Sequence, residues 1–335
     1  MTNKKLSLSL IVVGVVLLAA IIINITSRPQ ENPNKNTNES IKKVKISEAF
    51  EVFLHAPLWI AYDKGFFKEE GLDVDISIAG GDEKAWAAVV KGEADFAVGD
   101  PLFVAISGEK GQPGKVVASI LNGMPFWGIA KKSTVPKIEK PADLNGYSVA
   151  TLPAPSTNYA LQKEMFERAG LEPNIREVAF GGLLPALYAG EVDIALEWEP
   201  NVSKATQEGY EIVYAMADYY PEFAFTGLTT VPEYIENNRD TVQKVVNALQ
   251  KANTFIRENT DEAAILMAKR FDVSNEIAKK ALENFINNNM VTKDTITSQS
   301  AWDTAVKVRM NLGDLKEKAP YDQYVITDFS NQAKK

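Results

Sequence analysis

The stretch HAPLWIAYDKGFFKEEGLDVD, from His55 to Asp75, decides the fold of this chain. Pro57 suits the first turn of a helix, where its missing N–H would have no partner. Gly65 stands where the end of a helix favours a residue that tolerates positive φ. Apolar and polar residues then alternate over 73–78, and this period of two is typical of a strand. With a short strand over 44–46 before it, the stretch predicts a strand–loop–helix–strand unit.

The loop of that unit, over residues 50–55, is the first candidate for a binding site. In an α/β protein, ligands bind at the carboxyl ends of the strands, so we expect Phe53 and His55 to face a ligand. Trp59, at the start of the following helix, is close enough in sequence to join them. A lone histidine is more often structural or simply exposed, and both roles stay open for His55.

A similar sequence pattern occurs twice in the chain, about a hundred residues apart. KGEADFAVGDP at 91–101 and AGEVDIALEWEP at 189–200 both contain Gly-Glu-x-Asp, an apolar strand and a terminal proline. Strands alternate with helices on both sides of each copy. This order favours two similar α/β lobes, and a cleft between lobes is a preferred site for small molecules.

The predicted fold class is α/β, with two lobes joined by two crossing strands and preceded by an N-terminal membrane helix. The chain crosses to the second lobe near 126–130 and returns near 225–231. The helical C-terminal part packs on the first lobe. The expected boundaries are 1–27 for a signal anchor, 28–43 for a polar linker, 44–128 for the first part of lobe I, 129–225 for lobe II, and 226–335 for the return to lobe I.

The amino-acid composition excludes several types of functional site. The chain has 335 residues, a net charge of −8, no cysteine and one histidine. It therefore has no disulfide, no cysteine nucleophile, no lipid-modified N-terminal cysteine and no multi-histidine metal site. The acidic balance argues against a nucleic-acid partner. We expect no cofactor, no bound metal and no catalytic residue.

The N-terminus predicts export. Lys4 and Lys5 precede an apolar run from 6 to 25, which approaches the ~20 residues needed to span a bilayer. The run ends without a small-x-small cleavage site, so an uncleaved anchor is favoured over a cleaved signal peptide, which stays the alternative. Positive charges before the span place the remainder outside the cytoplasm. Residues 28–43 are polar and rich in Asn and Pro, as in a disordered tether.

Further candidates for the ligand site lie at strand ends and helix starts. Glu197 and Glu199 flank Trp198, and alternation puts both carboxylates on one side of an extended segment; ligand hydrogen bonds are favoured over an acid/base role. Asp82 is a predicted helix N-cap and Asp100 a possible one. Residues 156–158 open a helix, where free N–H groups attract polar ligands or an ordinary cap forms. The complete set of predicted ligand-binding residues is Phe53, His55, Trp59, Gly81, Asp100, Phe126, Trp127, Ser156, Thr157, Asn158, Glu197, Trp198 and Glu199.

From about Val44 onward the chain resembles the SsuA/THI5-like (NMT1) solute-binding proteins, whose ligands are nitrate, sulfonates, taurine or thiamine precursors. The opening motif carries the resemblance, together with the Gly-Gly loop at 80–81 and both Gly-Glu-x-Asp copies. Asp143-Leu-Asn-Gly146 and Glu199-Pro200 add to it. The resemblance implies a type II periplasmic-binding fold that clamps its ligand by hinge closure. It also implies delivery of the solute to the permease and ATPase subunits of an ABC importer.

The chain departs from the family pattern in ways that bear on the ligand. Family members often have glycine before the Ser-Thr of the second lobe, where this chain has Pro155. The predicted cleft loops carry Asp100, Glu197 and Glu199 but no clear arginine. Burying carboxylates beside an anion costs free energy. We therefore expect a neutral or cationic heteroaromatic solute, such as an aminopyrimidine-like thiamine precursor, with a sulfonate, taurine or nitrate as the alternative.

Three classes of protein remain in competition, and the sequence separates them. A membrane-tethered binding protein, acting as a monomer, agrees with the N-terminal anchor. A relative of the enzymes that build the thiamine pyrimidine would need reactive groups, and the chain lacks a cysteine cluster. A regulator with this fold would need a DNA-binding helix-turn-helix, and residues 4–25 cannot form one. The sequence favours the binding protein.

Overall fold

The computed structural model describes residues 41–154 and 156–333 of the chain. The predicted anchor at 1–27 and most of the predicted linker lie outside these residues. The first strand begins at Lys42, inside the range expected for the linker. Within the described ranges, no helix combines the length and apolar character that crossing a membrane requires.

The strands form two mixed five-stranded sheets. The first sheet has the order β2-β1-β3-β10-β4, and the second has the order β7-β6-β8-β5-β9. In each sheet the first three strands are parallel and the other two are antiparallel to their neighbours. The strand bounds are β1 Lys42–Glu48, β2 Leu72–Ile78, β3 Phe96–Gly99, β4 Lys115–Asn122, β5 Trp127–Lys131, β6 Val149–Thr151, β7 Ile175–Glu177, β8 Ile194–Glu197, β9 Tyr210–Ala215 and β10 Ala224–Thr230.

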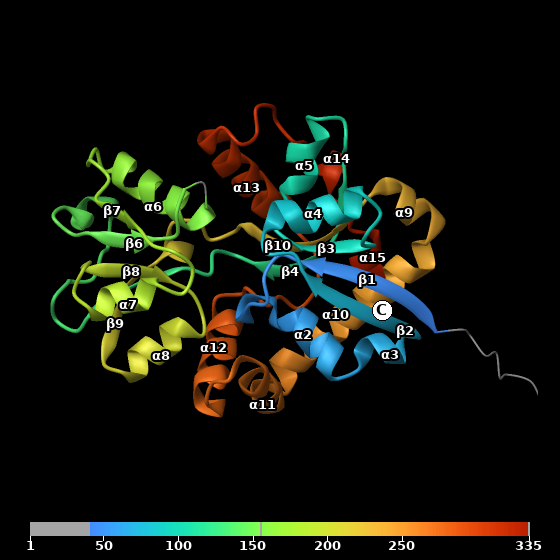
Figure 1. The fold of residues 1–335 in the computed structure, drawn as a ribbon, viewed down its shortest axis with the longest axis horizontal. Coiled ribbons are helices and arrows are strands. Elements are labelled where there is room, and N and C mark those ends of the chain that lie inside the picture. Colours follow the sequence, from blue (N-terminus) through green and yellow to red (C-terminus); the bar gives the residue numbers. More distant parts are fainter. Residues whose placement is uncertain (1–40, 155, 334–335) are drawn as a thin grey trace, which may run out of the picture. The chain divides into compact units, whose positions relative to one another are not determined.

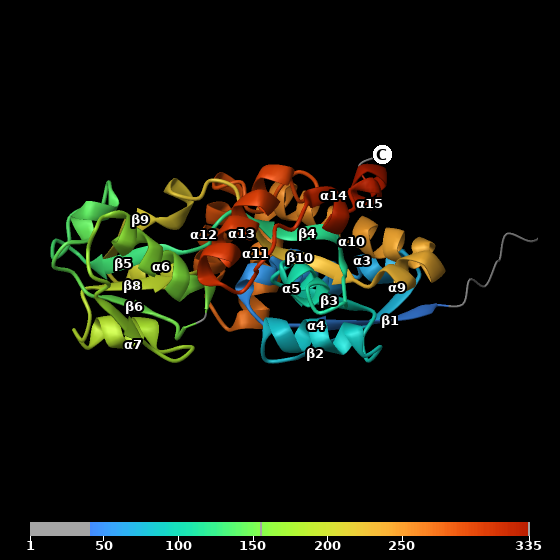
Figure 2. The same cartoon turned by 90° about the horizontal axis from the view of Figure 1, so that it is seen from above.

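Helices cover both sheets, and we call each sheet with its helices a lobe (Figure 1). Figure 2 shows the same division from above. The second lobe contains α6 Thr157–Arg168, α7 Leu183–Tyr188 and α8 Asn201–Gln207, which pack on its strands. The remaining helices are α2 Ala56–Asp63, α3 Phe66–Glu69, α4 Asp82–Val90, α5 Phe103–Gly108, α9 Pro232–Asn237, α10 Arg239–Glu258, α11 Thr260–Phe271, α12 Asn275–Asn287, α13 Gln299–Leu312, α14 Tyr321–Tyr324 and α15 Asp328–Ala333.

Much of the unit predicted around His55–Asp75 is confirmed. Pro57 lies in the first turn of α2, and Gly65, with φ of 80°, follows the helix end. Residues 53–55, expected as loop, form a short 3-10 helix. The Phe53 ring packs 5.4 Å from that of Phe271 and 6.0 Å from that of Phe285, measured between centroids. This packing ties the unit to the C-terminal helices α11 and α12.

The chain passes between the lobes twice. It leaves the first sheet after β4, enters the second at β5, leaves after β9 and returns at β10. Each arriving strand pairs with two neighbours, so both passages are fixed at their ends. The segments that connect the sheets are therefore residues 123–126 and 216–223. The second of these contains the 3-10 helix Met216–Asp218.

Gly128 in β5 is required by close packing. A Cβ at this position would lie 2.1 Å from a ring carbon of Tyr214, whose buried hydroxyl donates to Oε1 of Gln162 at 2.6 Å. We expect Gly128→Ala to lower the free energy of unfolding by about 1–3 kcal/mol, because the ring must shift in a filled core. Denaturant unfolding measures the change. Ile212→Val, at an exposed position of neighbouring β9, is the control, and an unchanged midpoint for Gly128→Ala would contradict the packing argument.

Candidate functional site

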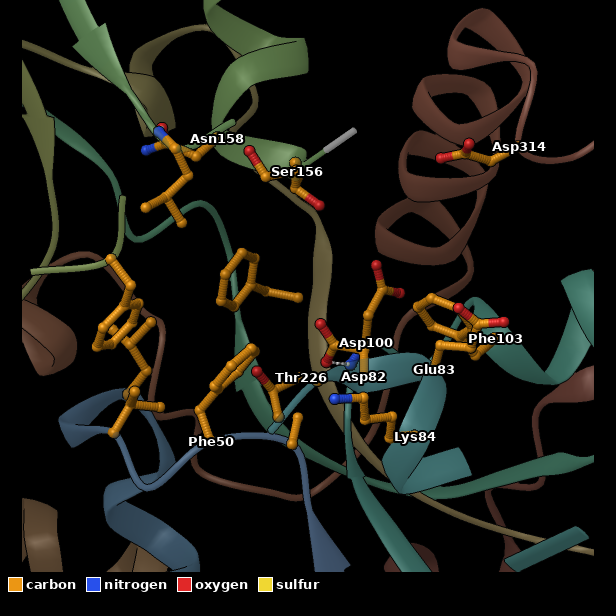
Figure 3. A pocket seen from close by; sticks show the side chains of 18 of the residues that line it. Phe50, Asp82, Glu83, Lys84, Asp100, Phe103, Ser156, Asn158, Thr226 and Asp314 are labelled. Carbon is orange, nitrogen blue, oxygen red and sulfur yellow. Dashed lines mark hydrogen bonds between the residues drawn. The ribbon is translucent and has the colours of Figure 1, made fainter. Parts of the chain in front are cut away.

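A cavity of about 710 Å³ is lined by both lobes, and the strand ends explain its position. The parallel strands of each sheet end beside it, as expected for an α/β ligand site. Figure 3 shows it from close by. Its lining residues are Ala49, Phe50, Val52, Leu54, His55, Gly81, Asp82, Glu83, Lys84, Asp100, Phe103, Ile106, Lys110, Phe126, Leu152, Pro153, Ser156, Thr157, Asn158, Phe180, Trp198, Phe225, Thr226, Arg309 and Asp314.

Aromatic side chains from both lobes form one wall of this cavity. Phe50, which follows β1, stacks on Phe180, which follows β7, with ring centroids 5.9 Å apart and planes 12° apart. Trp198 packs 5.7 Å from Phe180 and 6.0 Å from Phe126, which in turn lies 5.4 Å from Phe225. Such a group of rings can hold a flat apolar or heteroaromatic ligand.

Two aspartates of the first lobe occupy the polar part of the cavity. Asp82 is the first residue of α4; Gly81 takes the N-cap position, so the predicted capping role of Asp82 is wrong. Instead, Oδ1 of Asp82 accepts a hydrogen bond from the backbone N–H of Asp100 at 2.8 Å. Burial, and then the nearby Asp100 carboxylate, raise the pKa of Asp82. Asp100 accepts from the backbone N–H of Leu102 at 2.8 Å, a local cap of the turn before α5.

Arg309 on α13 is the main residue that the sequence did not indicate. Its guanidinium donates to Asp100 and, at 2.8 Å, to Asp314. It also reaches the second lobe, where it donates to Oγ1 of Thr157 at 3.1 Å. Burial lowers the pKa of Arg309, but the two carboxylates raise it more, so the group stays charged. The sequence-based expectation considered only loops, and this arginine comes from a helix.

His55 lines the cavity and is held from behind by a buried carboxylate. Its Nδ1 lies 2.6 Å from Oε1 of Glu48, the last residue of β1. Trp59 donates its indole N–H to the same oxygen at 3.1 Å, and Arg270 lies over the Trp59 ring at 3.9 Å. Burial raises the pKa of Glu48, although the hydrogen bond from His55 lowers it. Trp59 thus orients this pair and does not itself line the cavity.

The start of α6 contributes three lining residues. Ser156 is the N-cap and accepts from the backbone N–H of Tyr159 at 3.2 Å. Asn158 is buried; it accepts from the N–H of Leu152 and donates to the carbonyl of Leu196, both at 2.9 Å. The ordinary cap expected as one alternative is therefore present. Ser156 and Thr157 nevertheless line the cavity, and Oγ1 of Thr157 accepts a hydrogen bond from Arg309.

The two glutamates of the second copy are buried beside the cavity but do not line it. Glu197 accepts from the Asn201 side chain at 3.1 Å and from the N–H of Trp198 at 3.3 Å. Glu199 accepts from the N–H and the hydroxyl of Ser203, both at 3.0 Å, and from the Asn284 side chain on α12. These contacts hold the strand end against α8 and α12.

The structure therefore brings eight of the thirteen predicted site residues to the cavity. They are His55, Gly81, Asp100, Phe126, Ser156, Thr157, Asn158 and Trp198. The other five, Phe53, Trp59, Trp127, Glu197 and Glu199, are buried behind its walls. Ligand contact stays a prediction for every member of the set. Across the described ranges, no group of three or more potential protein ligands could hold a metal ion.

Burial raises the pKa of Glu197 to about 7 from an ordinary value of 4.5, although hydrogen bonds from Asn201 and Trp198 lower it. The folded protein thus holds this proton more tightly, so the associated stability is complete below pH ~4.5 and lost as the pH rises through ~7. Between pH 5 and 8 we expect the free energy of unfolding of the wild type to fall by up to about 3 kcal/mol more than that of Glu197→Gln. Denaturant unfolding across this range measures it. Glu172→Gln, at an exposed position, is the control; parallel curves for wild type and Glu197→Gln would contradict the assignment.

Comparison with known proteins supports the fold and gives the family. Over 295 residues the chain is 22% identical to the Bacillus subtilis (strain 168) protein named "Putative binding protein YtlA", covering 86% of this chain and 88% of that protein. It is 28% identical over 235 residues to the formylaminopyrimidine-binding protein of Halalkalibacterium halodurans, covering 66% and 68%.

A solved structure has the same fold. The ligand-binding component of an ABC-type import system from Staphylococcus aureus, solved with zinc bound, matches with a TM-score of 0.68 at 16% identity. The match covers 87% of this chain and 99% of that one. The chain also matches a Candida albicans protein described as having the generic periplasmic binding protein structural fold, with a TM-score of 0.60 at 15% identity, covering 85% of this chain and 96% of that one. The two mixed sheets thus belong to this fold. The family model described as "NMT1/THI5 like" matches residues 52–263. The chain therefore belongs to the NMT1/THI5-like family.

Proposed function

We propose that this protein is an extracytoplasmic solute-binding protein, which captures a small molecule between its lobes and delivers it to an ABC importer. The observation that carries the proposal is the cavity of about 710 Å³, lined by strand ends of both sheets. Its size is that of a typical small-molecule site. The likeness to a ligand-binding component of an import system supports the same role.

The solute is a neutral or cationic heteroaromatic molecule, such as a pyrimidine-like thiamine precursor. The aromatic wall suits a flat ring, and the Arg309 charge is already balanced by Asp100 and Asp314. An anion placed here would meet the carboxylate of Asp82, at a cost in free energy. The relative from Halalkalibacterium halodurans, named for binding formylaminopyrimidine, supports a ligand of this kind.

An anion such as an alkyl or aryl sulfonate, taurine or nitrate is the second candidate. The observation in its favour is that Lys84, Lys110 and Arg309 all line the cavity. Both lysines are exposed and strongly hydrated at the rim, so they contribute less than a buried cation would. We therefore rank this candidate lower.

The expected partners follow from this role. They are the solute, the permease and ATPase subunits of an importer, and a membrane that holds the N-terminal segment. We propose that the protein works as a monomer outside the cytoplasm, without catalysis, a cofactor or a nucleic-acid partner. An N-terminal anchor would keep it close to the permease, raising its effective concentration there.

A thermal-shift screen tests the proposed function. The panel contains aminopyrimidines, thiamine, flavins, amines, sulfonates and nitrate. A bound solute at a hundred times its Kd should stabilise the protein by about 2.7 kcal/mol. We expect pyrimidines or aromatic amines to raise the melting temperature. Shifts with sulfonates or nitrate alone would contradict the ligand class, and no shift with any compound would contradict the function.

Phe180→Ala tests the aromatic wall without disturbing the core. The Phe180 side chain is 61% exposed yet lines the cavity. Because one aromatic contact contributes about 0.5–1.5 kcal/mol, the variant should bind the solute about 2–12 times more weakly. Tyr188→Ala, at another exposed ring of the same lobe that does not line the cavity, is the matched control. Equal affinities for both variants, measured by calorimetric titration, would exclude Phe180 from the site.

A further inference from the structure

Asp82 differs from the other carboxylates that line the cavity. Asp100 and Asp314 are both paired with Arg309. Glu83, the second residue of α4, is exposed. Asp82 is held at the cavity wall, with Oδ1 bound to the backbone of Asp100 (Figure 3). Among the residues that the structure describes, none makes a hydrogen bond or ion pair with its Oδ2.

An acceptor in this position calls for a donor. Oδ2 is open to the cavity, so a ligand that covers it removes its hydration. That cost is offset when the ligand supplies a cation or an N–H group. The neighbouring cations are already engaged or turned elsewhere. Arg309 is bound to Asp100, Asp314 and Thr157, and Lys84 is exposed two residues along α4, where helix side chains do not face each other. His55 also lies near Asp82, but its Nδ1 is held by Glu48 and it makes no hydrogen bond with Asp82. A ligand in the cavity is therefore the donor that we expect.

The aromatic wall lines the same cavity. Phe180 and Trp198 from the second lobe, with Phe50 from the first, provide ring faces, while Asp82 provides a charge-assisted acceptor. A ligand that uses both needs a flat ring and, attached to it, a nitrogen that carries a positive charge. A hydroxyl in place of that nitrogen keeps one hydrogen bond but not the charge.

We propose that Asp82 determines the specificity of the cleft, by accepting a hydrogen bond from the protonated amine of an aromatic ligand whose ring lies against Phe180 and Trp198. This inference rests on the proposed solute-binding function and refines it. The protein would then distinguish an aromatic amine from the alcohol of the same shape. Asp100 would not replace Asp82, because its own carboxylate is already paired with Arg309.

Two matched pairs of probes test the proposal on the full chain, purified in a mild detergent. One pair is 4-amino-5-aminomethyl-2-methylpyrimidine and its 5-hydroxymethyl analogue, and the other is benzylamine and benzyl alcohol. In calorimetric titrations at pH 7.5, wild type should bind the better amine about ten to a hundred times more tightly than its alcohol. Asp82→Asn, which keeps the acceptor for the Asp100 N–H, should reduce that ratio to about one while still binding the alcohol.

Two further variants and the alcohol probe separate a specific effect from a general one. Glu93→Gln removes one negative charge from the same lobe at an exposed position outside the cavity, and it should leave the amine-to-alcohol ratio unchanged. Asp82→Glu keeps the charge and should retain a preference for the amine. A near-equal affinity of wild type for amine and alcohol, or an undiminished ratio in Asp82→Asn, would overturn the proposal.

Failure of this inference can be told apart from failure of the function. Absence of binding by both amines to wild type overturns the role of Asp82. The proposed function is still supported if another compound of the thermal-shift panel binds to wild type and binds more weakly to Phe180→Ala. It is contradicted if no compound of the panel binds.

Discussion

Carboxylates buried at the ends of strands constrain how the cleft is assembled. Glu48, Glu197 and Glu199 end or follow strands and are buried, and Asp82 and Asp100 lie at the cavity between them. An unpaired charge in such a place costs several kcal/mol. Most of the groups that satisfy these carboxylates are close in sequence, such as His55 for Glu48 and Asn201 for Glu197. Two are distant: Asn284 donates to Glu199, and Arg309 donates to Asp100. These two bonds bring helices α12 and α13 to the cleft.

The same contacts connect the two lobes. Arg309 binds Asp100 in the first lobe and Thr157 in the second. Helix α12 also contacts the second lobe: Asn284 donates to Glu199, and Lys280 donates to Thr206 at 2.9 Å. These few polar contacts, the stack of the two exposed rings Phe50 and Phe180, and two short connecting segments join the lobes. Such contacts are easier to exchange for water than a buried apolar interface. Such an arrangement is compatible with hinge closure around a solute.

Local features of the sequence predicted much of the fold. Pro57, Gly65 and the alternation over 73–78 act within a few residues of themselves, so the first unit could be predicted. The two Gly-Glu-x-Asp copies likewise placed β3 and β8, each followed by a cavity residue, Asp100 and Trp198. Short-range patterns of this kind do not depend on what the rest of the chain does.

The remainder of the site depends on long-range pairing. Arg309 meets Asp100 across 209 residues of sequence, and no local pattern marks Arg309. The sequence pattern also could not predict which way Glu197 and Glu199 point. Alternation predicts that both side chains lie on the same side of the strand, but not whether that side faces the cavity. The Gly-Gly loop has φ of 74° at Gly80 and 156° at Gly81, a backbone conformation that glycine adopts readily. Gly81 therefore takes the N-cap position of α4, and the Asp82 carboxylate lines the cleft.

A crystal structure of the protein with a bound aromatic amine would show whether the solute lies in the cleft with its amine against Asp82. We expect density for one solute in the cleft, with its ring against Phe180 and Trp198 and its amine within hydrogen-bond distance of Asp82. Both lobes should contact it. A solute bound outside the cleft, or bound in it with its polar group directed to Lys84 and Lys110 and away from Asp82, would contradict the account.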